Sequence, residues 1–156
     1  LMFSGLDQIE AELEIEPLTA VKIMQRDYEE IFNSNLKNTV FCEMAITYPN
    51  GNKITEAETF VPYKHIKLPN PEIEVQVAEV KDAYEIALKS QSFAPFVELD
   101  FTQADAIFED NYFCITGAEP VKIRLEKSDI WNIDELNAEK IKSILSVRSL
   151  RDTYEA

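Results

Sequence analysis

The chain has 156 residues, of which 46% are hydrophobic and 28% charged, a composition typical of one globular domain and unlike that of a disordered protein. Its 29 acidic residues outnumber 15 basic ones and give a net charge of −14, which disfavours binding to nucleic-acid phosphates and anionic membranes. No apolar run reaches the ~20 residues of a membrane-spanning helix, and no signal segment opens the sequence. We therefore expect a cytoplasmic protein with one domain over residues 1–156.

The first 32 residues predict a strand and a helix. Residues 9–16 alternate apolar residues with glutamate, which is the period of a half-buried strand, although the same residue types also suit a helix. Pro17 ends the segment in either case. From Thr19 to about Phe32, apolar residues recur three or four apart and predict an amphipathic helix.

Residues 39–61 predict a β-hairpin. Two runs rich in β-branched and aromatic residues flank Pro49-Asn50-Gly51-Asn52. Asn-Gly tolerates the positive φ angles of a tight hairpin turn. Pairing about Asn50 and Gly51 would place Phe41 opposite Phe60.

A second helix is predicted from Pro71 to about Lys89. Asn70 has the character of a helix cap, and proline and glutamate follow it in the first turn. Apolar residues then recur at spacings of four, three, four and four, at Ile73, Val77, Val80, Tyr84 and Leu88.

The remaining sequence predicts three strands and a last helix. The strands lie near residues 96–101, 112–116 and 121–126, Asp134 caps the helix, and residues 147–156 form a frayed polar tail. These elements predict an α+β fold, mainly an antiparallel sheet packed by two or three helices. The order of elements also suits a partly open barrel of the OB type.

The residues that most catalytic sites need are scarce. His65 is the single histidine, and the three glycines lie too far apart for a nucleotide-binding loop. With Cys42, Cys114 and His65, the chain has fewer ligands than a structural zinc site requires, and we interpret the two cysteines as buried thiols. The sequence thus predicts no cofactor, no resident metal and no catalytic residue.

Acidic residues concentrate in two stretches and favour a non-enzymatic protein that binds a basic protein partner. Carboxylates on alternate residues of a strand are about 7 Å apart, close to the phosphate spacing along one DNA strand, so such a protein could inhibit a nucleic-acid-processing enzyme by imitating DNA. The candidate partner-binding residues are Glu10, Glu12, Glu14, Glu16, Glu98, Asp100, Asp105, Glu109 and Asp110.

Two alternatives remain open. An OB-like accessory protein for single-stranded nucleic acid would pair phosphates and stack bases through local clusters of cations and an aromatic residue. Those residues are Tyr63, Lys64, His65, Lys67, Lys122, Arg124 and Lys127. A metal-dependent hydrolase would instead use Glu98 and Asp100, which alternate on one face of a predicted strand.

Overall fold

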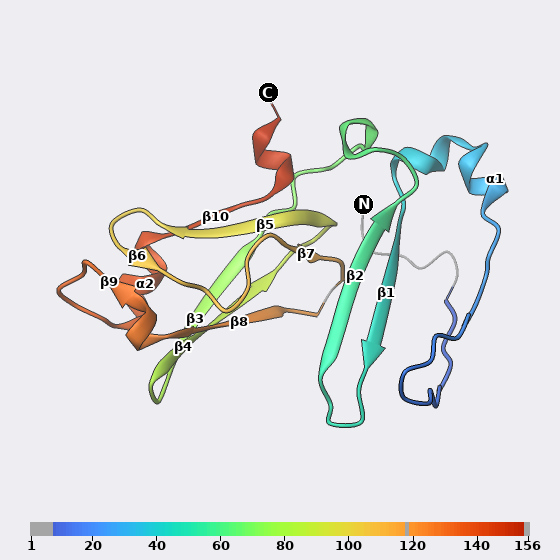
Figure 1. The fold of residues 1–156 in the computed structure, drawn as a ribbon. Helices are drawn as coiled ribbons and strands as arrows, with labels where there is room; N and C mark the ends of the chain where they lie inside the picture. The colour runs from blue at the N-terminus through green and yellow to red at the C-terminus, as the bar shows by residue number, and fades with distance from the viewer. Residues whose placement is uncertain (1–7, 118, 155–156) are drawn as a thin grey trace.

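The computed structural model of the chain describes residues 8–117 and 119–154. The remaining residues of the predicted 1–156 domain, including the end of its predicted tail at 155–156, lie outside this description. Figure 1 shows a β-sandwich at one side and a separate two-stranded hairpin at the other. No helix among the described residues is long and apolar enough to cross a bilayer.

Two three-stranded antiparallel sheets form the sandwich. One has the order β3 (Glu74–Val80), β4 (Ala83–Lys89), β8 (Val121–Glu126). The other has the order β10 (Leu145–Arg148), β5 (Ala94–Phe101), β7 (Phe113–Ile115). A short strand pair, β6 (Asp105–Ala106) with β9 (Ile130–Trp131), and helix α2 (Ala138–Ile144) lie together at one end (Figure 1).

The main core lies between these sheets. On β4, the alternate residues Tyr84, Ile86 and Leu88 are all fully buried. They pack in one cluster with apolar side chains of β5, β7 and β8 and with Ile141 and Ile144 of α2. In a sheet with one buried face, every second residue is apolar and points into the core. A shift of one residue would expose these side chains, so their burial fixes the register of the strands.

The predicted helix over 71–89 is wrong. These residues form β3 and β4, joined at Lys81-Asp82 and paired from Glu74 with Lys89 to Val80 with Ala83. Asn70 accepts a hydrogen bond from the Glu72 amide, which makes a local turn and caps no helix. The helical spacing arose because a two-residue turn separates two runs whose apolar residues alternate.

The predicted helix from Thr19 to Phe32 is also wrong over most of its length. Only α1 (Glu29–Phe32) is helical, and Thr19 instead closes a turn by donating from its amide and hydroxyl to the Glu16 carbonyl. Residues 9–16 belong to no strand pair, although the period-two pattern predicts a strand.

The predicted hairpin is confirmed as β1 (Phe41–Thr47) and β2 (Lys53–Thr59). Its register differs by one residue, because Phe41 pairs with Thr59. The Gly51 amide donates to the Tyr48 carbonyl, and Gly51 has φ of 86°. This is the three-residue loop with a left-handed glycine, not a two-residue turn.

Gly51→Ala should destabilise the chain by about 1 kcal/mol, because an alanine must adopt the same left-handed φ. A Cβ on Gly51 would meet nothing within 4 Å, so the cost is conformational and not steric. Gly117→Ala is the matched control, since Gly117 is equally open and does not have a positive φ. Urea unfolding of both variants checks this, and equal effects would contradict the turn geometry.

The fold is therefore a β-sandwich and not an α+β sheet packed by helices, nor is a closed or OB-like barrel present among residues 8–117 and 119–154. The strands predicted near 96–101, 112–116 and 121–126 are confirmed as β5, β7 and β8. The last helix, α2, is capped by Asn137 and not by Asp134. Where a frayed tail is predicted, the chain completes β10 and forms a 3₁₀ helix over Leu150–Thr153.

A second, smaller core joins the hairpin to the sandwich, and we call it the junction cluster. Its buried members are Ile66, Leu68 and Phe93. Phe41 of β1 stacks on Phe93 with ring centroids 4.2 Å apart. Packed around them are Ala57, Val61, Tyr63, Cys114, Leu150 and Tyr154.

A bulge in β5 supports the junction cluster. Between Ala94 and Val97 the register with β7 shifts, and Phe96 has φ of 51°. Such a bulge turns a side chain out of the ladder. The Phe96 ring packs edge-on against Tyr63 at 4.8 Å.

Candidate functional site

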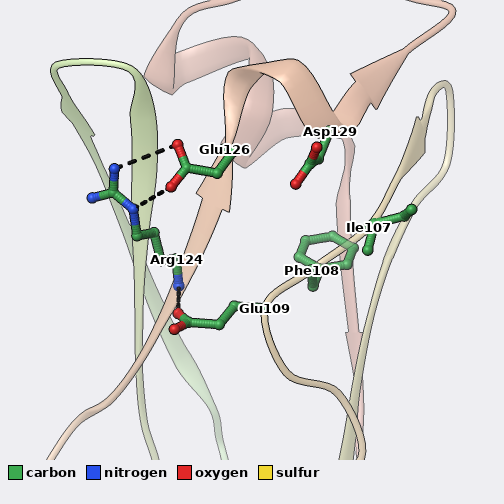
Figure 2. A pocket seen from close by; sticks show the side chains of 6 residues that line it. All are labelled: Ile107, Phe108, Glu109, Arg124, Glu126 and Asp129. Carbon is green, nitrogen blue, oxygen red and sulfur yellow. Dashed lines mark hydrogen bonds and ion pairs between the residues drawn. The ribbon is translucent and has the colours of Figure 1, made fainter.

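The sandwich has a shallow hollow of about 350 Å³ where β8 faces the segment after β6. Figure 2 shows its lining: three carboxylates, one arginine and two apolar side chains. They are Glu109, Glu126, Asp129, Arg124, Ile107 and Phe108. Phe108 forms the apolar wall and packs edge-on against Phe101 of the core.

The arginine of this hollow is already paired. Arg124 Nε donates to Glu126 Oε1 at 2.6 Å, and this bond raises the pKa of Arg124. The Arg124 amide donates to Glu109 Oε2 at 3.0 Å (Figure 2). The bond to Glu109 thus holds the segment after β6 against β8. Apart from Arg124, the polar side chains that line the hollow are all carboxylates.

Glu98, a candidate in two of the sequence interpretations, lies within a surface network. Arg148 of β10 donates to its carboxylate from two nitrogens, and Tyr112 Oη donates to Glu98 Oε1 at 2.9 Å. Both bonds lower the pKa of Glu98, the Tyr112 bond more strongly. The neighbouring Asp100 accepts from the Phe101 amide and does not join this network.

Tyr112→Phe should raise the pKa of Glu98 toward its ordinary value of 4.5, because the stronger of the two bonds to the ionised carboxylate is lost. In the folded chain this pKa is depressed, so its stabilising contribution is complete above pH 4.5 and is lost as pH falls through the folded value. Carboxyl carbon shifts in an NMR titration measure the change. Tyr48→Phe is the control, and an unchanged Glu98 pKa in Tyr112→Phe would rule out the bond.

The other acidic candidates do not gather at one site. Asp105 accepts from Asn132 beside the β6–β9 pair, and Asp110 accepts from the Asn111 amide. Glu109 lines the hollow. The exposed glutamates of residues 10–16 lie on the N-terminal segment, which forms no strand, and they are distant in sequence from the other acidic candidates.

The cations of the nucleic-acid alternative are split between two places. Lys122 pairs with Glu85 at 2.9 Å, Arg124 with Glu126, and Lys127 with Glu79. Tyr63 is half-buried in the junction cluster. Lys64, His65 and Lys67 lie exposed beside it, in and just after a 3₁₀ turn over Tyr63–His65.

The structure shows no assembled ligand set for a metal among the residues it describes, since no three His, Cys, Asp or Glu side chains lie together in a suitable group. Cys42 and Cys114 are both free thiols and partly buried. Burial raises the pKa of the Cys114 thiol, which favours its uncharged form.

Sequence reasoning missed an apolar face on the hairpin. Met44, Ile46 and Ile54 are 52%, 57% and 50% exposed. The pairing of Ile46 with Ile54 places them on the same face of the ribbon. The alternation Cys42, Met44, Ile46 was visible in the sequence, but it does not say whether that face packs inward or outward.

The two three-stranded antiparallel sheets and the core between them form a β-sandwich, which is the architecture of immunoglobulin-type domains. Residues 68–153 match the sequence model of the family Ig_mannosidase, described as an Ig-fold domain. Because the match spans more than half of the 156 residues, the chain belongs to this Ig-fold family. A search of curated proteins finds no match.

Proposed function

We propose that the chain is a non-enzymatic Ig-fold domain that binds a basic surface of a protein partner, and that this partner is a mannosidase. The observation that carries the proposal is the match of residues 68–153 to an Ig-fold family named for mannosidases. An Ig-type sandwich is a scaffold on which binding surfaces are displayed, so its fold alone assigns no reaction.

The charge of the chain supports a basic partner surface. With a net charge of −14, the chain attracts a basic surface over a distance set by ionic screening, about 8 Å at physiological salt. Such attraction speeds association and selects partners of opposite charge.

The two alternatives gain less support from the same geometry. The strand cations Lys122, Arg124 and Lys127 each pair with a glutamate of the chain, which would compete with phosphates. In the metal-dependent alternative, Glu98 and Asp100 would bind the ion together. The Glu98 carboxylate already accepts hydrogen bonds from Arg148 and Tyr112, so only Asp100 of this pair is outside that network. No specific observation favours either alternative.

Retention of a mannosidase on the immobilised chain tests the proposal. A lysate of the organism that carries this sequence is passed over the chain at about 50 mM salt, and hydrolysis of α- and β-nitrophenyl mannosides is measured in the retained fraction. We expect activity to be retained and then released at about 500 mM salt, because exposed charges are screened there. The purified chain alone should hydrolyse neither compound.

Two results would contradict the proposal. If no mannosidase activity is retained at low salt, the partner is wrong. If the purified chain itself hydrolyses a mannoside, the non-enzymatic role is wrong.

A further inference from the structure

The exposed apolar side chains of the described residues are unevenly distributed. Thirteen of the eighteen large hydrophobic residues that are exposed lie between Ile9 and Ile54. In the same region, no described residue before Ile66 is buried. Single exposed apolar side chains are common on protein surfaces, whereas a large exposed apolar patch usually marks an interaction site.

The hairpin in this region has two different faces. Strand pairing places Cys42, Met44, Ile46, Ile54, Glu56 and Glu58 on one face, which we call the outer face. The opposite, inner face carries Phe41 and Ala57, which pack into the junction cluster, and otherwise smaller or polar residues such as Ala45 and Thr55.

The amphipathic character of the hairpin is thus the reverse of the usual one. The face that meets the chain's own core is mostly small and polar, while the face with Met44, Ile46 and Ile54 is exposed. A two-stranded ribbon is only marginally stable in water by itself. The usual way to cover such a face is a second sheet packed about 10 Å away.

Charge decides between a second copy and a different partner. Glu56 and Glu58 lie on the outer face and are both exposed. Docking of two copies through this face would place the carboxylates of both copies in one interface, in a chain of net charge −14. Like charges across an interface suppress association, whereas lysine or arginine at the rim of a partner would complement them.

We propose that the outer face of the hairpin docks a β-sheet of the protein partner, apolar at its centre and basic at its rim. This inference rests on the proposed function, since it names the surface through which that partner is bound. Met44, Ile46 and Ile54 pack against the apolar centre, and Glu56 and Glu58 pair with the basic rim. The two sheets together form the sandwich that the hairpin lacks.

A peptide probe tests the apolar part of this surface. The probe is a labelled β-hairpin peptide with valine on one face and lysine at the remaining positions, and its binding is followed by fluorescence anisotropy. We expect Ile46→Lys combined with Ile54→Lys to weaken binding at least about tenfold, which corresponds to 1.4 kcal/mol. The control Ile107→Lys changes an isoleucine that is 62% exposed on the sandwich, and it should leave binding within about twofold.

A second pair of variants tests the charges. Glu56→Gln combined with Glu58→Gln should weaken binding of the lysine probe, whereas Glu43→Gln, on the inner face of the same hairpin, should not. A matched probe with glutamate in place of lysine should bind the unchanged chain at least about tenfold more weakly. Because the changed side chains are exposed, circular dichroism should show unchanged folding in all variants.

Three results would overturn the inference: no binding of the lysine probe, equal binding by the Ile46/Ile54 variant, or a dimer in sedimentation that this variant abolishes. The last would assign the face to a second copy. Failure of the probe with mannosidase still retained would reject the surface and keep the proposed function. Probe binding without mannosidase retention would keep the surface and reject the partner.

Discussion

Ile86→Ala should lower the free energy of unfolding by about 2–5 kcal/mol, because it removes a fully buried side chain and leaves a cavity between two packed sheets. Ile86 lies on β4 between Tyr84 and Leu88, and all three side chains enter the main core. Ile107→Ala is the matched control: its side chain is 62% exposed, and its loss should change stability by about 0.5 kcal/mol or less.

This pair of variants also separates the sandwich from the helix that the sequence predicts over the same residues. In a helix, Ile86 would lie roughly 200° around the axis from Tyr84, away from the apolar stripe, and its truncation would cost little. In a strand, residues two apart share a face. Chemical denaturation measures the difference, and equal small losses in both variants would reject the strand assignment.

Asn111→Ala should destabilise the chain by roughly 2–4 kcal/mol, since it leaves two backbone groups of a buried residue without partners. Asn111 Oδ1 accepts from the Leu99 amide at 2.8 Å, and its Nδ2 donates to the Leu99 carbonyl at 2.9 Å. Leu99 is 2% exposed, so water cannot readily replace these bonds. The Asn111 side chain thus extends the pairing of β5 to a position two residues before β7 begins.

Asn111→Asp is a sharper variant of the same test. It keeps an acceptor for the Leu99 amide but replaces the donor with an oxygen that faces the Leu99 carbonyl. We expect it to be destabilised as well, and more strongly at pH 7 than at a pH low enough to protonate the new carboxyl group. Asn70→Ala, which removes only an exposed local turn bond, should cost less than either. Equal losses at positions 70 and 111 would contradict the role of Asn111.

Local turn chemistry was the part of the fold that the sequence predicted well. Asn50-Gly51 located the hairpin, and the alternation of apolar and charged residues located β8 over Val121–Glu126. The register was missed by one residue because the loop is one residue longer than the shortest Asn-Gly turn.

The helix predicted over 71–89 failed because apolar spacing was weighed above residue type. Val75, Val77 and Val80 are β-branched, which favours strands, and Lys81-Asp82 could have been recognised as a turn. Because this segment forms β3 and β4, the predicted α+β fold lacks its longest helix. These two strands instead supply two of the three strands of one sheet of the sandwich.

The surface contacts could not be predicted because they join distant segments. Glu98 and Arg148 are 50 residues apart, and no local pattern links them. The outer face of the hairpin was missed for a different reason. Alternation identifies two faces of a ribbon, but only the packing of Phe41 and Ala57 shows which one turns toward the core.

Retention of mannosidase activity on three immobilised forms of the chain tests the account most directly: unchanged, Ile46→Lys with Ile54→Lys, and Ile107→Lys. The account predicts that the unchanged chain and the Ile107 variant retain the activity at low salt, and that the Ile46/Ile54 variant does not. Retention by all three forms would show that the partner binds elsewhere, and retention by none would contradict the proposed binding of a mannosidase.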